Sequence, residues 1–387
     1  MTPQRTDVDV LVIGAGQAGL SAAFHLRRLG LSPGDGYVVL DHAPGPGGAW
    51  QFRWPSLTLS TVNGVHDLPG ASFDEYADIG DLPGTVRASA AVPRYFGDYE
   101  ERFALPVRRP VDVRVVCDRD GLLHAETDAG LYVARGVINA TGTWERPFVP
   151  FHPGAARFAG RTLHTRDYRT PDEFAGARVV VVGGGISALQ ILDEVSRVAD
   201  TLWVTRREPV FSDVPFTPEA GTAAVARVED RVRRGLPPGS VVSVTGLPVT
   251  PAVRAARERG VLDRHPMFDE ITEHGVRWPD GTEYEADVII WNTGFRSALD
   301  HLAPLRLRGP GGGITMTGRL ATQVARDARI HLVGYGPSAS TIGANRAGRA
   351  AATELTRHLA LPTRVGPPPV SDREKGSAGG SPRSALG

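Results

Sequence analysis

Residues 8–20 read VDVLVIGAGQAGL, and this stretch decides the fold. The valine-rich run 8–13 is typical of a buried strand. Glycines then follow at the spacing G-x-G-x-x-G, and the alanine-rich segment through Arg28 indicates a helix. A second apolar run, Tyr37–Leu40, comes next. Strand, glycine turn, helix and strand in this order predict the opening of a parallel α/β domain.

The glycine turn of this stretch predicts a dinucleotide site. Gly14 permits the tight turn, Gly16 lets a pyrophosphate approach the backbone, and Gly19 lets the helix pack closely on the strand. The helix N-terminus at Gln17 presents unpaired N–H groups and a positive dipole end to phosphates. Asp41, at the end of the second strand, is expected to accept hydrogen bonds from ribose hydroxyls. We assign this first site to FAD.

The same pattern recurs at 178–205, where RVVVV leads into glycines, a helical segment and the strand TLWVT. Here the turn has the form G-x-G-x-x-A, and Arg206 and Arg207 stand where an acid is expected. Guanidinium donors pair with a 2′-phosphate, whereas a carboxylate would repel it. The second site is therefore predicted to prefer NADPH to NADH. Its turn residues are Gly183, Gly185, Ser187 and Ala188.

Further strands complete an α/β fold with two Rossmann-like dinucleotide-binding domains, the NADPH domain being inserted into the FAD domain. We expect a small antiparallel sheet with a returning strand at 111–116 and 131–138, later strands at 286–291 and 329–333, a helix at 345–360, and loops and helices over the second unit at 215–270. The predicted boundaries are 1–160 and 292–362 for the FAD domain, 161–291 for the NADPH domain, and 363–387 for a disordered tail.

Small residues after strands allow close backbone approach to a cofactor. The helix after Thr341 is expected to point its N-terminus at the flavin, where negative charge accumulates on reduction. The segment 50–100 carries aromatic residues predicted to form part of a substrate pocket, namely Trp54, His66, Phe73, Tyr76, Tyr95 and Phe96. Further predicted cofactor contacts are Gly48, Trp50, Val113, Thr141, Gly142, Thr293, Gly294, Gly334 and Tyr335.

Composition excludes several classes of protein. Lys+Arg and Asp+Glu both number 43, so the basic surface of a nucleic-acid binder is not expected. Cys117 is the single cysteine, which rules out a disulfide framework or a Cys-x-x-Cys redox pair within the chain. The sequence has no signal peptide and no long apolar run, so a cytoplasmic location without a membrane span is expected. No metal site is predicted.

The stretch 158–168 reads FAGRTLHTRDY and fits F-x-G-x-x-x-H-x-x-x-Y. With this motif between its two glycine turns, the chain resembles the flavin-containing monooxygenases, as a compact bacterial-type member. Gly-Gly-x-Trp at 47–50, two prolines at 147 and 150, and Asp287 fit the same superfamily. The related Baeyer–Villiger monooxygenases typically have Trp as the last motif residue, so Tyr168 favours oxidation of nitrogen or sulfur.

The resemblance implies that NADPH reduces FAD, and that O2 then gives a C4a-(hydro)peroxyflavin which oxygenates a small organic substrate. The catalytic residues it implies are Ser60, Asn63, His164 and Tyr168. The family often carries an asparagine after the segment that matches 57–59. Here Ser60 stands at that place and Asn63 follows. Either Asn63 takes over this contact with shifted geometry, or the oxygen-activating contact is altered.

Three other functions remain open at this stage: a Baeyer–Villiger monooxygenase, an NADPH oxidase or flavin reductase without oxygen insertion, and a non-catalytic sensor that binds FAD and NADPH. A thiol-relay reductase is removed by the lack of a Cys-x-x-Cys pair. The predicted partners are a small-molecule substrate and O2, with no nucleic acid and no membrane. The sequence leaves the oligomeric state open and allows a homodimer.

Overall fold

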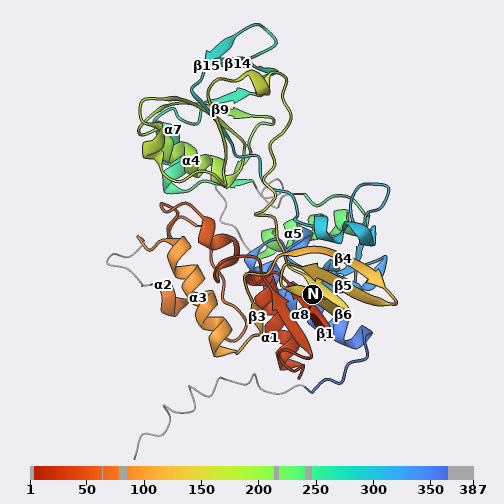
Figure 1. Ribbon diagram of the computed structural model, residues 1–387. Coiled ribbons are helices and arrows are strands. Elements are labelled where there is room, and N and C mark those ends of the chain that lie inside the picture. The colour runs from red at the N-terminus through yellow and green to blue at the C-terminus, as the bar shows by residue number, and fades with distance from the viewer. Residues whose placement is uncertain (1–3, 63, 78–84, 213–217, 240–245, 365–387) are drawn as a thin grey trace, which may run out of the picture.

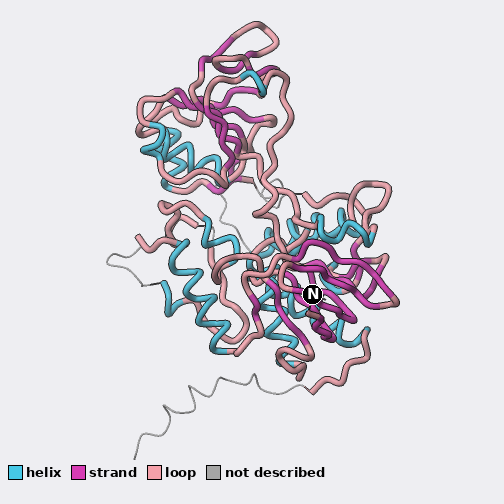
Figure 2. Tube along the Cα trace, in the orientation of Figure 1, coloured by secondary structure: helices cyan, strands magenta, loops and turns pink. Residues whose placement is uncertain are grey.

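The structure, a computed structural model, describes residues 4–62, 64–77, 85–212, 218–239 and 246–364. Two α/β units lie one above the other (Figure 1), and Figure 2 shows that loops connect them. The predicted catalytic residue Asn63 lies outside the described residues, as does all but the start of the predicted tail.

The first unit is built on a nine-stranded sheet. Its strands are β1 (Arg5–Ile13), β2 (Tyr37–Leu40), β3 (Val107–Arg108), β4 (Val113–Arg119), β5 (Leu122–Thr127), β6 (Gly130–Asn139), β17 (Met316–Thr317), β18 (Gln323–Val324) and β19 (Asp327–Leu332). The order is β17-β18-β19-β6-β1-β2-β3, with β4 and β5 attached beside β6. β2, β1, β6 and β19 pair in parallel, so their carboxyl ends meet at one edge of the sheet.

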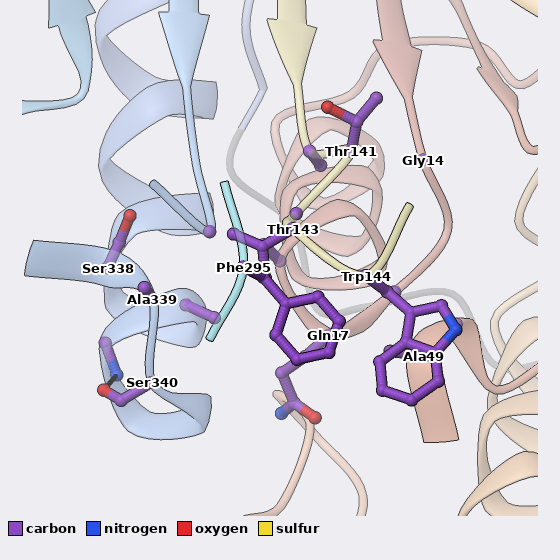
Figure 3. A pocket seen from close by; sticks show the side chains of 18 of the residues that line it. Gly14, Gln17, Ala49, Thr141, Thr143, Trp144, Phe295, Ser338, Ala339 and Ser340 are labelled. Atoms are coloured by element: carbon purple, nitrogen blue, oxygen red, sulfur yellow. Dashed lines mark hydrogen bonds between the residues drawn. The ribbon is translucent and has the colours of Figure 1, made fainter. Parts of the chain in front are cut away.

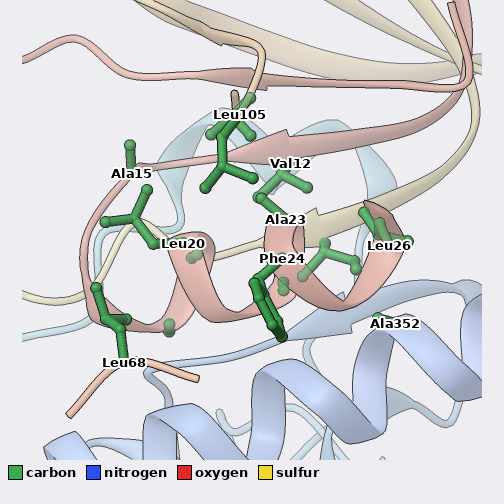
Figure 4. Packing of buried hydrophobic residues seen from close by; sticks show 14 of the residues in the cluster. Val12, Ala15, Leu20, Ala23, Phe24, Leu26, Leu68, Leu105 and Ala352 are labelled. Atoms are coloured by element: carbon green, nitrogen blue, oxygen red, sulfur yellow. The ribbon is translucent and has the colours of Figure 1, made fainter. Parts of the chain in front are cut away.

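Helices cover one face of this sheet. They are α1 (Gln17–Arg28), α2 (Asp74–Ala77), α3 (Ala88–Arg102) and α8 (Thr341–His358). Val12 of β1, Phe24 of α1 and Ala352 of α8 share one buried apolar cluster (Figure 4). Alanines on the facing sides of α1 and α8 let these helices approach closely, because small side chains keep the helix axes near each other. This packing fixes where both helices begin.

The second unit has a five-stranded parallel sheet in which alternate residues face two different layers. Its strands are β7 (Arg161–His164), β8 (Arg178–Val182), β9 (Asp200–Thr205), β12 (Arg264–Pro266) and β16 (Val288–Trp291), in the order β12-β9-β8-β16-β7. Val179 and Val181 pack with α4 (Ile186–Val195) and α7 (Pro251–Glu258), whereas Val180 and Val182 face the other side. That side is covered by the sheet of β13 (Glu270–Ile271), β14 (Gly275–Arg277) and β15 (Glu283–Glu285).

The α/β fold with two Rossmann-like units is confirmed, and the strands expected at 37–40 and 178–182 have those bounds. The expectation for 215–270 is wrong for α5 (Pro218–Arg233), because its buried Val232 belongs to the core of the first unit. Short strands also occur there, and β10 (Phe211–Ser212) pairs with β11 (Leu247–Pro248).

Both glycine turns are held against the end of a neighbouring strand. Gly14 has φ +99°, and a Cβ built there would lie 2.6 Å from the carbonyl oxygen of Ala140. Gly183 has φ +142°, and a Cβ there would overlap the carbonyl oxygen of Asn292. A Cβ at Gly19 would overlap the carbonyl oxygen of Gly14. The first two positions require glycine for backbone conformation and close approach, whereas Gly19 requires it for close approach alone.

We expect Gly19→Ala to destabilise the ligand-free protein by about 1–3 kcal/mol or more, because the added methyl group overlaps backbone that cannot move aside. Gly16→Ala is the matched control, since a Cβ there meets no protein atom within 4 Å. Its cost should stay within about 1 kcal/mol, the usual penalty range for one helix-cap change. Urea unfolding of the three proteins measures the difference, and equal losses for both variants would contradict it.

Candidate active site

A cleft of about 1840 Å³ is lined by residues of both units. Ordinary ligand pockets occupy about 300–1,000 Å³, so this cleft has room for more than one small ligand. The predicted cofactor residues that line it are Gly14, Gly16, Gln17, Asp41, Gly48, Trp50, Val113, Thr141, Gly142, Ser187 and Gly334. Those that lie outside its lining are Gly19, Gly183, Gly185, Ala188, Arg206, Arg207, Thr293, Gly294 and Tyr335.

The first glycine turn opens directly into this cleft. No side chain caps the N-terminus of α1, and no acidic residue stands in its first turn. Above Gly16 the backbone is open, since a Cβ there would meet nothing within 4 Å. Gln17 Nε2 donates to His66 O (3.2 Å) and Asn345 Oδ1 (3.0 Å), whereas its buried Oε1 has no hydrogen-bond partner. These uncapped N–H groups and the open backbone form an anion site.

Asp41 is held in place at the end of β2 by charged neighbours. Its Oδ2 lies 3.4 Å from Nη2 of Arg109. The Nη1 atom of the same arginine lies 2.6 Å from Glu100 Oε2. Its Oδ1 accepts a hydrogen bond from the backbone N–H of Ala43 at 3.3 Å. Burial raises the pKa of Glu100, and Arg109 opposes that shift. The arrangement keeps the Asp41 carboxylate fixed at the cleft, where it can accept hydrogen bonds from hydroxyls.

The N-terminus of α8 also points at the cleft. Ser340 caps the helix by accepting a hydrogen bond from Gly343 N at 3.1 Å. Ser338, Ala339 and Ser340 line the cleft together and face Gln17 across it (Figure 3). The expected position of this helix is thus observed, but the three residues before it were not predicted. The turn signal Gly334-Tyr335-Gly336 stands just upstream and could have indicated them.

An aromatic wall, formed by Trp50, Phe52, Trp144 and Phe295, lines the cleft. Trp144 and Phe295 stack with ring centroids 5.2 Å apart, and both point into the cleft in Figure 3. Trp144 also stacks on Phe52 at 6.5 Å. Of these four, sequence reasoning singled out only Trp50. Phe295 follows one Thr-Gly segment directly and Trp144 follows the other after one residue, which is the signal that could have found them.

The predicted pocket aromatics of 50–100 divide into two groups. Trp54 and His66 line the cleft, as expected. The prediction is wrong for Phe73, Tyr95 and Phe96, which are buried in the apolar core beneath α3, and for Tyr76, which packs against that core. Tyr95 donates to Ala71 O (2.9 Å), so its hydroxyl is satisfied away from the cleft. These rings pack instead in one apolar cluster with α1 and with the strands β1 and β2.

The second glycine turn borders the same cleft through Ile186, Ser187 and Gln190. No side chain caps the N-terminus of α4, and the backbone above Gly185 is open. Arg206 and Arg207 follow the end of β9 and are exposed, outside the lining of the cleft. In Rossmann-like units the ribose of the dinucleotide lies near the end of this strand, which here is Thr205.

His164 joins the two units at Gly294. Its Nδ1 accepts from the backbone N–H of Arg166 (3.2 Å), so Nε2 carries the proton and donates to Gly294 O (3.0 Å). Burial lowers the pKa of His164, which keeps the ring neutral at pH 7. Gly294 O accepts a second hydrogen bond from Phe148 N at 3.0 Å. His164 lies outside the cleft lining, and its geometry is that of a positioning residue.

Tyr168 and Ser60 also lie outside the lining of the cleft. Tyr168 is buried and donates to Glu194 Oε2 at 2.6 Å, while its ring packs edge-on against Trp54. Ser56 donates to the same carboxylate oxygen at 2.7 Å, which ties α4 to the loop after Trp54. Ser60 is exposed, and its hydroxyl lies 2.8 Å from Thr58 Oγ1. None of these groups faces the space that a reacting substrate would occupy.

Two glycine turns that open into one cleft define a class of oxidoreductases that bind two dinucleotides. Residues 11–220 match the family described as pyridine nucleotide-disulphide oxidoreductase. A flavin-containing monooxygenase from Stenotrophomonas maltophilia, of known structure, is 38% identical with a TM-score of 0.76, and the match covers 91% of this chain and 99% of that one. The chain belongs to this oxidoreductase family and is a flavin-dependent monooxygenase, with FAD and NADPH as cofactors.

Two curated relatives extend the comparison. An oxidoreductase from Geobacillus kaustophilus, described as CzcO-like, is 26% identical over 318 residues, which cover 78% of this chain and 87% of that protein. A Baeyer–Villiger monooxygenase from Streptomyces coelicolor is 30% identical over 209 residues, covering 53% of this chain and 38% of that protein. The disulphide chemistry in the family description has no cysteine pair to support it here, since Cys117 stands alone.

The geometry of the first site fits FAD. The uncapped N-terminus of α1 and the open backbone at Gly16 suit a pyrophosphate, and the unpartnered Gln17 Oε1 can accept a hydrogen bond from a donor group of the cofactor. Within the described ranges, no helix is long and apolar enough to cross a membrane. In the same ranges no group of three or more His, Cys, Asp or Glu side chains is placed to hold a metal ion.

His301 gives the cleft a testable pH dependence. Its Nε2 lies 2.7 Å from Asn139 Oδ1, and burial lowers its pKa to about 4 from 6.5. The unfolded chain therefore takes up this proton near pH 6.5 and the folded chain only near pH 4, so the stability that depends on neutral His301 is full above pH 6.5 and is lost as the pH falls. We expect about 1.4 kcal/mol of unfolding free energy to be lost per pH unit in that window.

His301→Gln should remove this part of the acid sensitivity, because glutamine keeps a donor toward Asn139 and does not titrate. Urea unfolding of both proteins, repeated at several pH values between neutral and mildly acidic, measures the slope. The variant should show the shallower dependence. Parallel curves would mean that His301 does not titrate as its burial indicates.

Proposed function

We propose that this monooxygenase transfers one oxygen atom of O2 to a nitrogen or sulfur atom of a small organic molecule. The observation that carries the proposal is that both glycine turns open into one cleft with an aromatic wall. In the balanced reaction, substrate, O2, NADPH and a proton give oxygenated substrate, NADP⁺ and water. FAD supplies the redox chemistry when it is bound, and the chain itself binds, orients and excludes water.

Each part of the cleft has a role in this proposal. Gly14, Gly16 and the N-terminus of α1 would hold the FAD pyrophosphate, and Asp41 the adenosine ribose. The N-terminus of α8 would place its positive dipole end at the ring that becomes negatively charged on reduction. Trp144 and Phe295 would keep water from the reacting atoms. We assign residues 1–160 and 292–362 to the FAD domain and 161–291 to the NADPH domain, with α5 packing on the former.

His164 and Tyr168 would act as positioning residues rather than as acids or bases. His164 fixes Gly294 at the junction of the units, and Tyr168 fixes Trp54 at the cleft. Movement of NADP⁺ in the second unit would therefore shift residues at the flavin site through these two contacts. We also propose a cytoplasmic enzyme, on the ground that its single cysteine, Cys117, forms no disulfide within the chain.

A Baeyer–Villiger reaction is the second candidate, supported by the relative from Streptomyces coelicolor. Tyr168 at the last motif position favours nitrogen or sulfur oxidation instead. The third candidate is an NADPH oxidase, which the replacement of the family asparagine by Ser60 would favour. Ser60 is exposed, is hydrogen-bonded to Thr58 and lies outside the lining of the cleft.

Product analysis under heavy-isotope O2 tests the proposal. With a panel of small thioethers, amines and cyclic ketones, we expect sulfoxide or N-oxide that carries one heavy oxygen atom, formed in equal amount to the NADPH consumed. Ketones should give no lactone. Peroxide released in equal amount to NADPH with every substrate would establish an oxidase, and lactone as the main product would establish the Baeyer–Villiger reaction.

Arg206 and Arg207 test the second site separately. Replacing both with alanine removes charge-assisted donors that, at these exposed positions, are together worth about 1.5–3 kcal/mol to a 2′-phosphate. We expect the preference for NADPH over NADH, measured as the ratio of their kcat/KM values in cofactor oxidation, to fall by about 10- to 100-fold. Arg197→Ala is the matched control, since this exposed arginine of the same unit pairs with Asp193. An unchanged ratio in the double variant would show that neither arginine binds the 2′-phosphate of NADPH.

A further inference from the structure

Arg53 is a cation without a counter-ion inside the cleft. It directly follows the 3-10 helix Gly48–Phe52 and lines the cleft beside the aromatic wall. Its guanidinium carbon lies 4.5 Å from the centroid of the Trp144 ring and 5.9 Å from that of Trp50. Its Nε is buried and has no hydrogen-bond partner. Within the described part of the chain, the Arg53 side chain forms neither an ion pair nor a hydrogen bond.

Five carboxylates line the cleft among the described residues, and four of them are paired with cations other than Arg53, Glu229 with Arg233 at 2.5 Å. The fifth, Asp112, forms no ion pair with Arg53. Asp41 lies 3.4 Å from Arg109, Glu145 lies 2.9 Å from Arg166, and Asp300 pairs with Arg146. Each of these acids is therefore neutralised without Arg53. Among the described arginines of the cleft lining, Arg53 is the one that is not exposed.

Such an arrangement is costly unless something pairs with the charge. Burial of an ionised group without a partner is among the largest single penalties in a folded protein. Contact with Trp144 offsets only part of it, about 0.5–2 kcal/mol for a cation over a ring. Burial lowers the pKa of Arg53 to about 10, so the guanidinium stays charged at pH 7. Its unused N–H donors are left for a ligand in the cleft.

We propose that Arg53 binds the carboxylate of the substrate, so that the enzyme oxygenates organic anions whose apolar part lies against Trp144 and Phe295. This inference rests on the proposed function and names the substrate class of the same site. A planar guanidinium matches a carboxylate in a bidentate manner, and contact with Trp144, 4.5 Å from the guanidinium carbon to the ring centroid, holds it beside the aromatic wall. The stacked rings, 5.2 Å apart, then offer apolar surface for the rest of the molecule.

The anionic groups of the two cofactors have other partners in this chain. The FAD pyrophosphate is assigned to the turn at Gly14–Gln17, and the NADPH phosphates to the N-terminus of α4 and to Arg206 and Arg207. Arg53 belongs to neither glycine turn and lies instead on the aromatic wall. A substrate carboxylate is the anion that these assignments leave without a partner.

Binding of a matched acid and amide to the FAD-loaded enzyme tests this assignment. The probes are (phenylthio)acetic acid and its neutral amide, which share a thioether and an aromatic ring and differ in charge. Dissociation constants come from the change in flavin absorbance and, independently, from the shift in melting temperature. A charge-assisted pair predicts that the wild-type enzyme binds the acid about 10- to 100-fold more tightly than the amide.

Arg53→Met should abolish this discrimination while leaving amide binding within about threefold, since methionine keeps apolar contact with Trp144. Arg53→Lys should retain part of it, because the charge remains without the fork. Arg146→Met is the matched control, since this exposed arginine of the cleft pairs with Asp300, and discrimination should persist. If Arg53→Met fails to fold, the wild-type acid-to-amide ratio and the Arg53→Lys variant still decide the matter.

The proposal is overturned if wild-type enzyme binds acid and amide equally, or binds neither. It is also overturned if Arg53→Met loses FAD or weakens NADPH binding while the discrimination survives, because Arg53 would then serve a cofactor. Binding requires no oxygen transfer. An enzyme that discriminates through Arg53 but releases only peroxide would therefore overturn the proposed oxygenation and keep this inference.

Discussion

The close approach of a glycine to the end of a neighbouring strand organises both halves of this enzyme. Gly14 lies against Ala140, and Gly183 lies against Asn292, at distances that admit no side chain. The surrounding hydrogen bonds repeat as well, since Ala140 N donates to Ile13 O and Asn292 N donates to Val182 O, both at 2.7 Å. Each contact sets a helix N-terminus at the edge of a parallel sheet and leads the chain out through a Thr-Gly segment. The cleft lies where the chain segments that follow these two contacts come together.

The two turns differ at their third position, and the difference has a structural cause. Gly19 cannot carry a methyl group because it would overlap Gly14 O, whereas the second turn holds a fully buried Ala188 at the same place. The first helix therefore lies closer to its turn than the second helix does. Hydrogen bonds also link the segments that follow the two turns, because Gly294 O accepts from both His164 Nε2 and Phe148 N. The F-x-G-x-x-x-H-x-x-x-Y stretch therefore has a structural role. Its His164 contacts Gly294, and its Tyr168 contacts Trp54.

Local patterns in the sequence predicted what depends on neighbouring residues. The strand bounds at Tyr37–Leu40 and Arg178–Val182, both glycine turns and the start of α8 follow from short-range periodicity and turn chemistry. The docking of α5 could not be predicted, because its amphipathic face fits either unit and only the contact of Val232 decides between them. The aromatic wall was missed for the same reason. Its members come from three separate segments, at 50–52, 144 and 295, that meet only in the folded chain.

A partly buried arginine in an aromatic cleft also accounts for how substrates can be positioned without the residues of the F-x-G-x-x-x-H-x-x-x-Y motif. The side chains that motif reasoning marked as catalytic, His164 and Tyr168, are satisfied elsewhere and do not reach the cleft. Orientation must then come from binding. An apolar wall alone holds a ligand without fixing its direction, since hydrophobic contact is not directional. One charged contact at Arg53 fixes one end of the molecule, and Trp144 holds the guanidinium beside the aromatic wall. Water can then be excluded from the reacting end without loss of alignment.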